Sequence, residues 1–178
     1  FPFASTSTDA AMVQSLAANT SYTVGVSGVN GTQGVALAEI YDANPAAGSR
    51  LVNISARGYS GTGSNVLILG FIIGGSGTER LLIRGIGPTL AKYGLGGVLA
   101  NPQLSLFNSD SQLVASVGAW GGDPDLAAIM KQSGAFDLDP GSADSAMLLN
   151  LPSGIYTIQL SGMNDTSGLG LIEVYELH

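Results

Sequence analysis

The chain has 178 residues, of which 45% are apolar and only 11% are charged, and 13 acidic side chains outweigh six basic ones. The six basic residues are scattered, so binding to nucleic acid or to an anionic membrane surface is not expected. The best apolar run, residues 66–73, is far too short to span a bilayer, so we expect no membrane insertion. Cysteine is absent, which excludes thiolate chemistry.

Residues 1–44 repeat residues 136–178, and residues 45–135 have no second copy. We call these three parts the N-terminal copy, the C-terminal copy and the central segment. The sequence therefore predicts an N-terminal half-module, 1–44, followed by one complete module, 45–178. The identical pairs are Phe1/Phe136, Ser7/Ser142, Asp9/Asp144, Ala11/Ala146, Met12/Met147, Leu16/Leu151, Tyr22/Tyr156, Thr23/Thr157, Ser27/Ser161, Gly28/Gly162, Asn30/Asn164, Thr32/Thr166, Gly34/Gly168, Leu37/Leu171, Glu39/Glu173 and Tyr41/Tyr175.

Each copy is predicted to form three strands. A short apolar run comes first, and two alternating runs then flank a turn rich in Gly and Asn, which is typical of a β-hairpin. A half-module of three strands would expose an apolar face and free sheet edges, so it needs a covering partner. The runs are 11–16, 22–27 and 35–41 in the N-terminal copy, and 146–151, 156–161 and 169–175 in the C-terminal copy.

The central segment continues with short strands separated by turns. Residues 66–73 are almost all apolar, as in a strand buried on both faces. Strands at intervals of about 8–12 residues favour a β-sandwich, so we predict an all-β fold, an antiparallel, jelly-roll-like sandwich with one short helix. The other predicted strands are 51–57, 80–86, 103–107 and 113–117.

The short helix is predicted to begin after Asp123. This residue is a good N-cap, Pro124 suits the first helical position, and Gly134 suits the C-terminal stop. Residues 88–93 are predicted to form a second, shorter helix.

Candidate chemistry is sparse. The single histidine is His178, and terminal residues are poor places for a catalytic base, so we expect no enzyme and no catalytic residue. Carboxylates crowd the junction between the central segment and the C-terminal copy, and carboxylates suit calcium. They lack the order of a calcium loop and also fit helix capping and a polar loop. We therefore expect no cofactor, with calcium kept as the alternative. The weak metal candidates are Asp123, Asp125, Asp137, Asp139 and Asp144.

Three motifs carry a resemblance: residues 84–88 (RGIGP), residues 101–107 (NPQLSLF) and residues 156–162 (YTIQLSG). With them, residues 45–178 resemble a tandem module of uncharacterised secreted bacterial surface proteins. They are more distantly similar to the pre-peptidase C-terminal β-sandwich, an accessory domain of secreted enzymes. The resemblance implies an extracellular or cell-surface location and offers no catalytic residues.

The surplus half-module leads to the functional hypothesis. We expect a structural subunit of an extracellular filament or surface assembly that polymerises head to tail with itself by β-strand complementation. The N-terminal copy would be the donor and the central segment the acceptor. Alternatively, both copies pack against the central segment of their own chain, or the chain is a carbohydrate-binding or adhesion module whose partners are surface glycans. The predicted donor residues at the subunit interface are Val24, Val26, Val35, Leu37 and Ile40.

Overall fold

The computed structural model describes residues 3–43, 48 and 50–177, and the chain divides into two compact units, Phe1–Arg50 and Leu51–His178. His178 and the predicted boundary between residues 44 and 45 lie outside the described residues.

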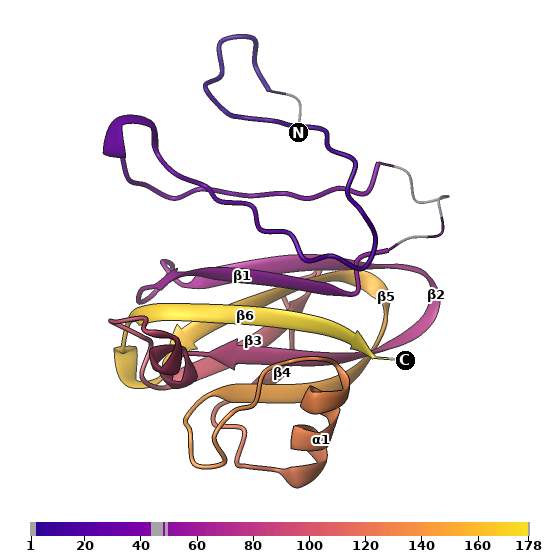
Figure 1. Ribbon diagram of the computed structural model, residues 1–178, viewed down its shortest axis with the longest axis vertical. Helices are drawn as coiled ribbons and strands as arrows, with labels where there is room; N and C mark the ends of the chain where they lie inside the picture. The colour runs from indigo at the N-terminus through magenta and orange to yellow at the C-terminus, as the bar shows by residue number, and fades with distance from the viewer. Residues whose placement is uncertain (1–2, 44–47, 49, 178) are drawn as a thin grey trace. The chain divides into compact units, whose positions relative to one another are not determined.

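The second unit is built on one antiparallel sheet, with its strands in the order β1-β6-β2-β5-β3-β4 (Figure 1). The all-β prediction is therefore confirmed. The strands are β1 (Asn53–Ser60), β2 (Leu67–Ile86), β3 (Pro102–Asn108), β4 (Leu113–Val117), β5 (Ser145–Gly162) and β6 (Gly168–Leu177).

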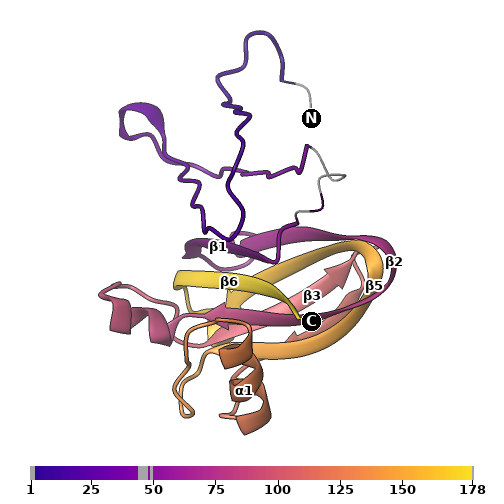
Figure 2. The ribbon, with the colours of Figure 1, turned by 45° about the vertical axis from the view of Figure 1, so that its right-hand side comes forward.

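Two long strands, β2 and β5, form the middle of the sheet and pair along most of their length, with a register shift between Ile73 and Thr78. The sequence predicted a turn here that separates two strands. Instead, Gly75 and Gly77 take positive φ angles, which glycine tolerates, and the strand continues through the irregularity. Figures 1 and 2 show both long strands curving, so that the sheet turns back on itself.

The irregularity divides the sheet into two parts. The first half-sheet holds β1, β6 and residues 78–86 and 145–152, and the second holds residues 67–73 and 154–162 with β3 and β4. Their inner faces meet at Gly85, where an added Cβ would lie 2.7 Å from Leu160 Cδ1 and 2.8 Å from Leu104 Cγ. We predicted a jelly-roll-like sandwich, and in the structure the strands of this unit enclose their core within one bent sheet.

The outer side of the first half-sheet is covered by the α-helix and its flanking loops. Helix α1 (Pro124–Gln132) begins after Asp123, whose carboxylate accepts from the amides of Asp125 and Leu126, as the sequence predicted. Its Met130 is buried in a second core cluster with Leu82. The other predicted helix is the 3-10 helix η3 (Pro88–Tyr93).

Within the described residues of this unit, 51–177, no helix or loop covers the outer side of the second half-sheet in this way. Residues 66–73 were predicted to be buried on both faces, and this is wrong: Ile68 is 50% exposed and Ile72 is 70% exposed, while Leu69 is buried. Ile72 lies opposite Ile155 of β5, which is also exposed. The outer surface of this half-sheet is therefore partly apolar.

The N-terminal copy differs from the prediction most. Among residues 3–43 the structure has no strand, and its one regular element is the 3-10 turn η1 (Val29–Gly31). The physical reason is that a strand has no hydrogen bonds of its own, so an alternating sequence becomes a strand only beside a partner. The three strands predicted for this copy are therefore absent from the described chain.

Candidate functional site

The C-terminal copy is an arch rather than a hairpin. Residues 156–162 of β5 lie in the second half-sheet and β6 lies in the first, so β5 and β6 are not neighbours, which corrects the hairpin prediction. The 3-10 turn η4 (Met163–Asp165) joins them, with Asn164 in a left-handed conformation at φ 57° and ψ 40°. We call residues 156–177 the C-terminal arch.

The central segment contains a matching arch, residues 53–73. Its first strand, β1, pairs with β6 of the C-terminal arch, and its last part, residues 67–73, pairs with β5. The two arches are therefore stacked antiparallel, strand against strand. The facing pairs include Asn53/Tyr175, Arg57/Leu171, Ser60/Gly168, Leu67/Leu160, Leu69/Ile158 and Phe71/Tyr156.

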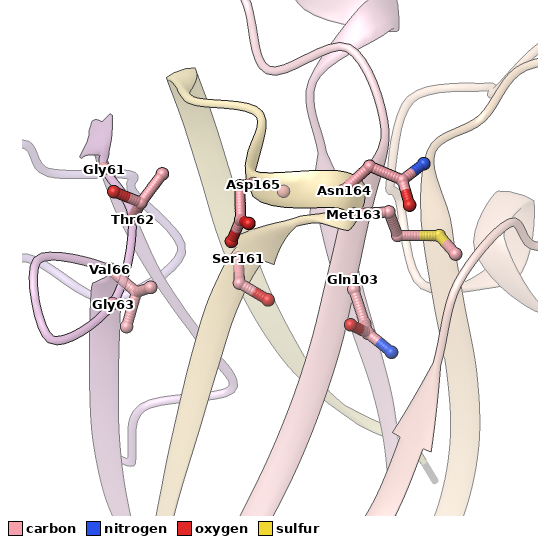
Figure 3. Close-up of a pocket in the computed structure, with 10 residues that line it drawn as sticks. Gly61, Thr62, Gly63, Val66, Gln103, Ser161, Met163, Asn164 and Asp165 are labelled. Carbon is pink, nitrogen blue, oxygen red and sulfur yellow. The ribbon is translucent and has the colours of Figure 1, made fainter.

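The turns of the two arches border a depression of about 420 Å³. Figure 3 shows Thr62 and Val66 on one side, Gln103 on the other, and Ser161 and Asp165 between them. Its lining is mostly polar and contains no aromatic ring.

A buried ion pair fastens the C-terminal arch to the central segment. Arg84 of β2 is fully buried, and its Nε and Nη2 donate to Glu173 Oε2 at 2.9 and 2.5 Å. Its Nη1 donates to the carbonyl of Phe136, whose ring lies 4.3 Å from the guanidinium carbon. Tyr175 Oη donates to the other Glu173 oxygen at 2.9 Å. Sequence reasoning did not single out Arg84 or Glu173 as a pair, although the Glu39/Glu173 identity was a signal.

A second set of buried hydrogen bonds, to the carboxylate of Asp144, also connects the C-terminal copy to the central segment. This buried carboxylate accepts from the Gly87 amide at 2.8 Å and from Thr89 Oγ1 at 2.5 Å, and so holds the start of η3 against the C-terminal copy. Of the other acidic candidates, Asp123 caps α1, Asp125 lies in its first turn, and Asp139 pairs with Lys92. Asp137 lies exposed in the loop after α1. Among the described residues no three His, Cys, Asp or Glu are grouped as they would be to hold a metal.

The five predicted donor residues are all exposed, whereas their counterparts in the C-terminal copy are part of the folded module. The exposed fractions are 59% for Val24, 59% for Val26, 101% for Val35, 76% for Leu37 and 56% for Ile40. The counterparts Ile158, Leu160 and Val174 are 0%, 0% and 5% exposed, and Leu169 and Leu171 are intermediate. The same apolar pattern is thus buried in one copy and exposed to solvent in the other.

Polar details also recur in the N-terminal copy. Asn30 has φ 56° and ψ 29°, close to Asn164, and Thr32 Oγ1 donates to the Val29 carbonyl at 3.0 Å, as Thr166 does to Met163. Tyr41 Oη donates to Glu39 Oε1 at 2.9 Å, which repeats the pair of Tyr175 and Glu173. The hydrogen bond to Glu39 raises the pKa of Tyr41, whereas burial is the main cause that raises the pKa of Tyr175, and the charge of Glu173 raises it further.

Comparisons with known proteins add no relative: no family model matches the chain, and neither a curated protein nor a solved structure matches it significantly. Within the described residues, none of the helices combines the length and the apolar character that crossing a membrane requires.

Proposed function

We propose that this chain is a structural subunit of an extracellular filament or surface assembly, in which the N-terminal copy of one subunit completes the sheet of the next. The observation that carries the proposal is the contrast between the copies. Val24, Val26 and Ile40 are more than half exposed, and their counterparts are almost completely buried. Burying a side chain of this size completely contributes about 1.5–3 kcal/mol of favourable free energy. Burial of these exposed side chains in the sheet of another subunit would therefore be strongly favourable.

The polar positions of the N-terminal copy support the same proposal. Glu39 and Asp9 retain the side chains with which Glu173 and Asp144 hold the central segment. A segment with no packing role has no physical need for this set of side chains. The contact between subunits would be heterologous, so repetition gives a closed ring or an open filament, depending on the rotation between neighbours.

The resemblance to secreted surface modules supports placing this assembly outside the cell or on its surface. The partner is the chain itself, and the mechanism is mechanical rather than catalytic. No cofactor has a role in it, and calcium stays an alternative that this mechanism does not use.

The test is negative-stain electron microscopy and sedimentation of the purified chain at neutral pH. We expect filaments of constant width from the wild type and none from a Val24→Asp/Ile40→Asp variant. The control carries Thr20→Asp and Gln33→Asp, which add the same charge at exposed polar positions of the same segment. Equal melting temperatures for all three chains would show that the sheet unit is intact.

Filaments from the Val24→Asp/Ile40→Asp variant would contradict the donor role. A wild-type chain that stays monomeric would contradict polymerisation itself. Binding of that monomer to a glycan array would then favour the carbohydrate-binding alternative.

A further inference from the structure

The acceptor for the N-terminal copy can be located more closely, and this inference rests on the proposed function. Two strand edges of the central arch have no partner among the described residues. Strand β1 ends the sheet order and pairs with β6 alone, and residues 67–73 pair with β5 alone. Both edges belong to the arch of residues 53–73, on the side opposite to the C-terminal arch.

The C-terminal arch pairs with the same two strands on their other edges. Residues 156–160 pair with residues 67–71, and residues 168–175 of β6 pair with the whole length of β1. The N-terminal copy carries the same pattern in residues 22–43, with the turn at Asn30 already formed in the conformation of the turn at Asn164. An N-terminal arch of this shape would match the two free edges of the central arch at once.

The number of arch copies per chain favours adding the N-terminal copy to these free edges over exchanging it for the C-terminal copy of another subunit. Each chain has two copies of the arch and one central segment. If the N-terminal copy displaced the C-terminal copy from a second subunit, one copy per chain would still be left without a sheet. Adding the arch to the free edges leaves every existing pair in place and satisfies a new row of backbone groups.

The free edges have the character of an acceptor. Residues 67–73 read LILGFII, with no charge and no proline, so this edge lacks the usual features that prevent strand addition. Strand β1 carries exposed Arg57 and no acidic residue, while residues 1–44 contain three acidic residues and no basic one. Glu39 corresponds to Glu173, which lies opposite Ser55, and Ser55 is two residues from Arg57 on the same face of β1. Opposite charges placed diagonally across strands attract each other.

We propose that the central arch of one subunit binds the N-terminal arch of a second copy of this chain, with residues 22–28 along residues 67–73 and residues 34–43 along β1. Both contacts are antiparallel. The three arches would then form a continuous stack, with the C-terminal arch on one side of the central arch and the neighbour's N-terminal arch on the other.

Engineered cysteines test this placement, because the natural chain has none. Ser21 corresponds to Ile155, which pairs with Ile72, so Ser21→Cys in one chain should face Ile72→Cys in another. We expect mild oxidation of the mixed single-cysteine chains to give a disulfide-linked dimer. The control mixes Ser21→Cys with Leu113→Cys on β4, which is 58% exposed and lies at the opposite end of the sheet.

The outcomes separate this inference from the proposed function. Filaments together with the Ser21–Ile72 cross-link, and little cross-linking to position 113, would support both. Filaments without that cross-link, or with equal cross-linking to both positions, would overturn the edge placement and leave the filament standing. Monomers that form the disulfide only within one chain carrying both Ser21→Cys and Ile72→Cys would overturn both, because the arch would then close on its own subunit. Monomers without any cross-link would also overturn both.

Discussion

Arg84 and Glu173 are 89 residues apart in the chain, yet the guanidinium donates twice to one carboxylate oxygen inside the folded unit. Arg84 lies on β2 of the central segment, and Glu173 lies on β6 of the C-terminal copy, so the ion pair joins these two parts of the chain. The counterpart of Glu173 in the N-terminal copy is Glu39, which is exposed and accepts a hydrogen bond from the Tyr41 hydroxyl. The repeat therefore offers a matched control within one molecule.

Glu173→Gln should destabilise the chain strongly, because it leaves the buried Arg84 without its counter-charge. Removing one partner of a buried pair costs about 3–5 kcal/mol in the free energy of unfolding. Glu39→Gln, in the exposed copy, should change it by less than about 0.5 kcal/mol. Denaturant unfolding of the two full-length variants measures both values. Similar losses for the two would show that the ion pair does not fasten the unit.

Gly168→Ala should also destabilise the chain, because the added Cβ would lie 2.6 Å from the Leu99 amide nitrogen and 2.8 Å from the Gly97 oxygen. These are backbone atoms, held by hydrogen bonds to Leu169 on either side, and overpacking of this kind costs about 1–3 kcal/mol. The matched change, Gly34→Ala, meets nothing within 4 Å. Thermal unfolding should therefore show a lower melting temperature for the first variant alone, and a normal melting temperature for Gly168→Ala would refute the predicted clash.

The stability of the chain should fall at alkaline pH partly through Tyr175. Burial, and then the charge of Glu173, raise its pKa in the folded state above the ordinary tyrosine value of about 10. The unfolded chain releases this proton first, so the contribution of Tyr175 is complete below about pH 10 and is lost as the pH rises through the higher folded-state pKa.

Tyr175→Phe removes that proton, so its free energy of unfolding should decline less steeply with pH than that of the wild type above about pH 10. Denaturant unfolding at a series of pH values from 8 to about 11 measures the two slopes. Parallel slopes would mean that Tyr175 does not contribute to the pH dependence.

The sequence by itself determined the local features of this protein. The turns at Asn30 and Asn164 have nearly the same backbone angles in both copies, although only one of them joins two strands. Helix α1 begins at its predicted cap, and η3 has its predicted bounds. Each of these features depends on contacts between residues close in the chain, which a short sequence pattern specifies.

Only the tertiary structure decided which alternating segments become strands and what they pair with. Residues 168–177 form β6 between β1 and β2, while the similar residues 34–43 form no strand. The same holds for Arg84, whose pairing with Glu173 links distant segments, and for the arch that the sequence indicated as a hairpin. A strand forms its hydrogen bonds with a neighbouring strand and is buried by its neighbours. Whether a segment becomes a strand therefore depends on a partner that the segment's own residues do not specify.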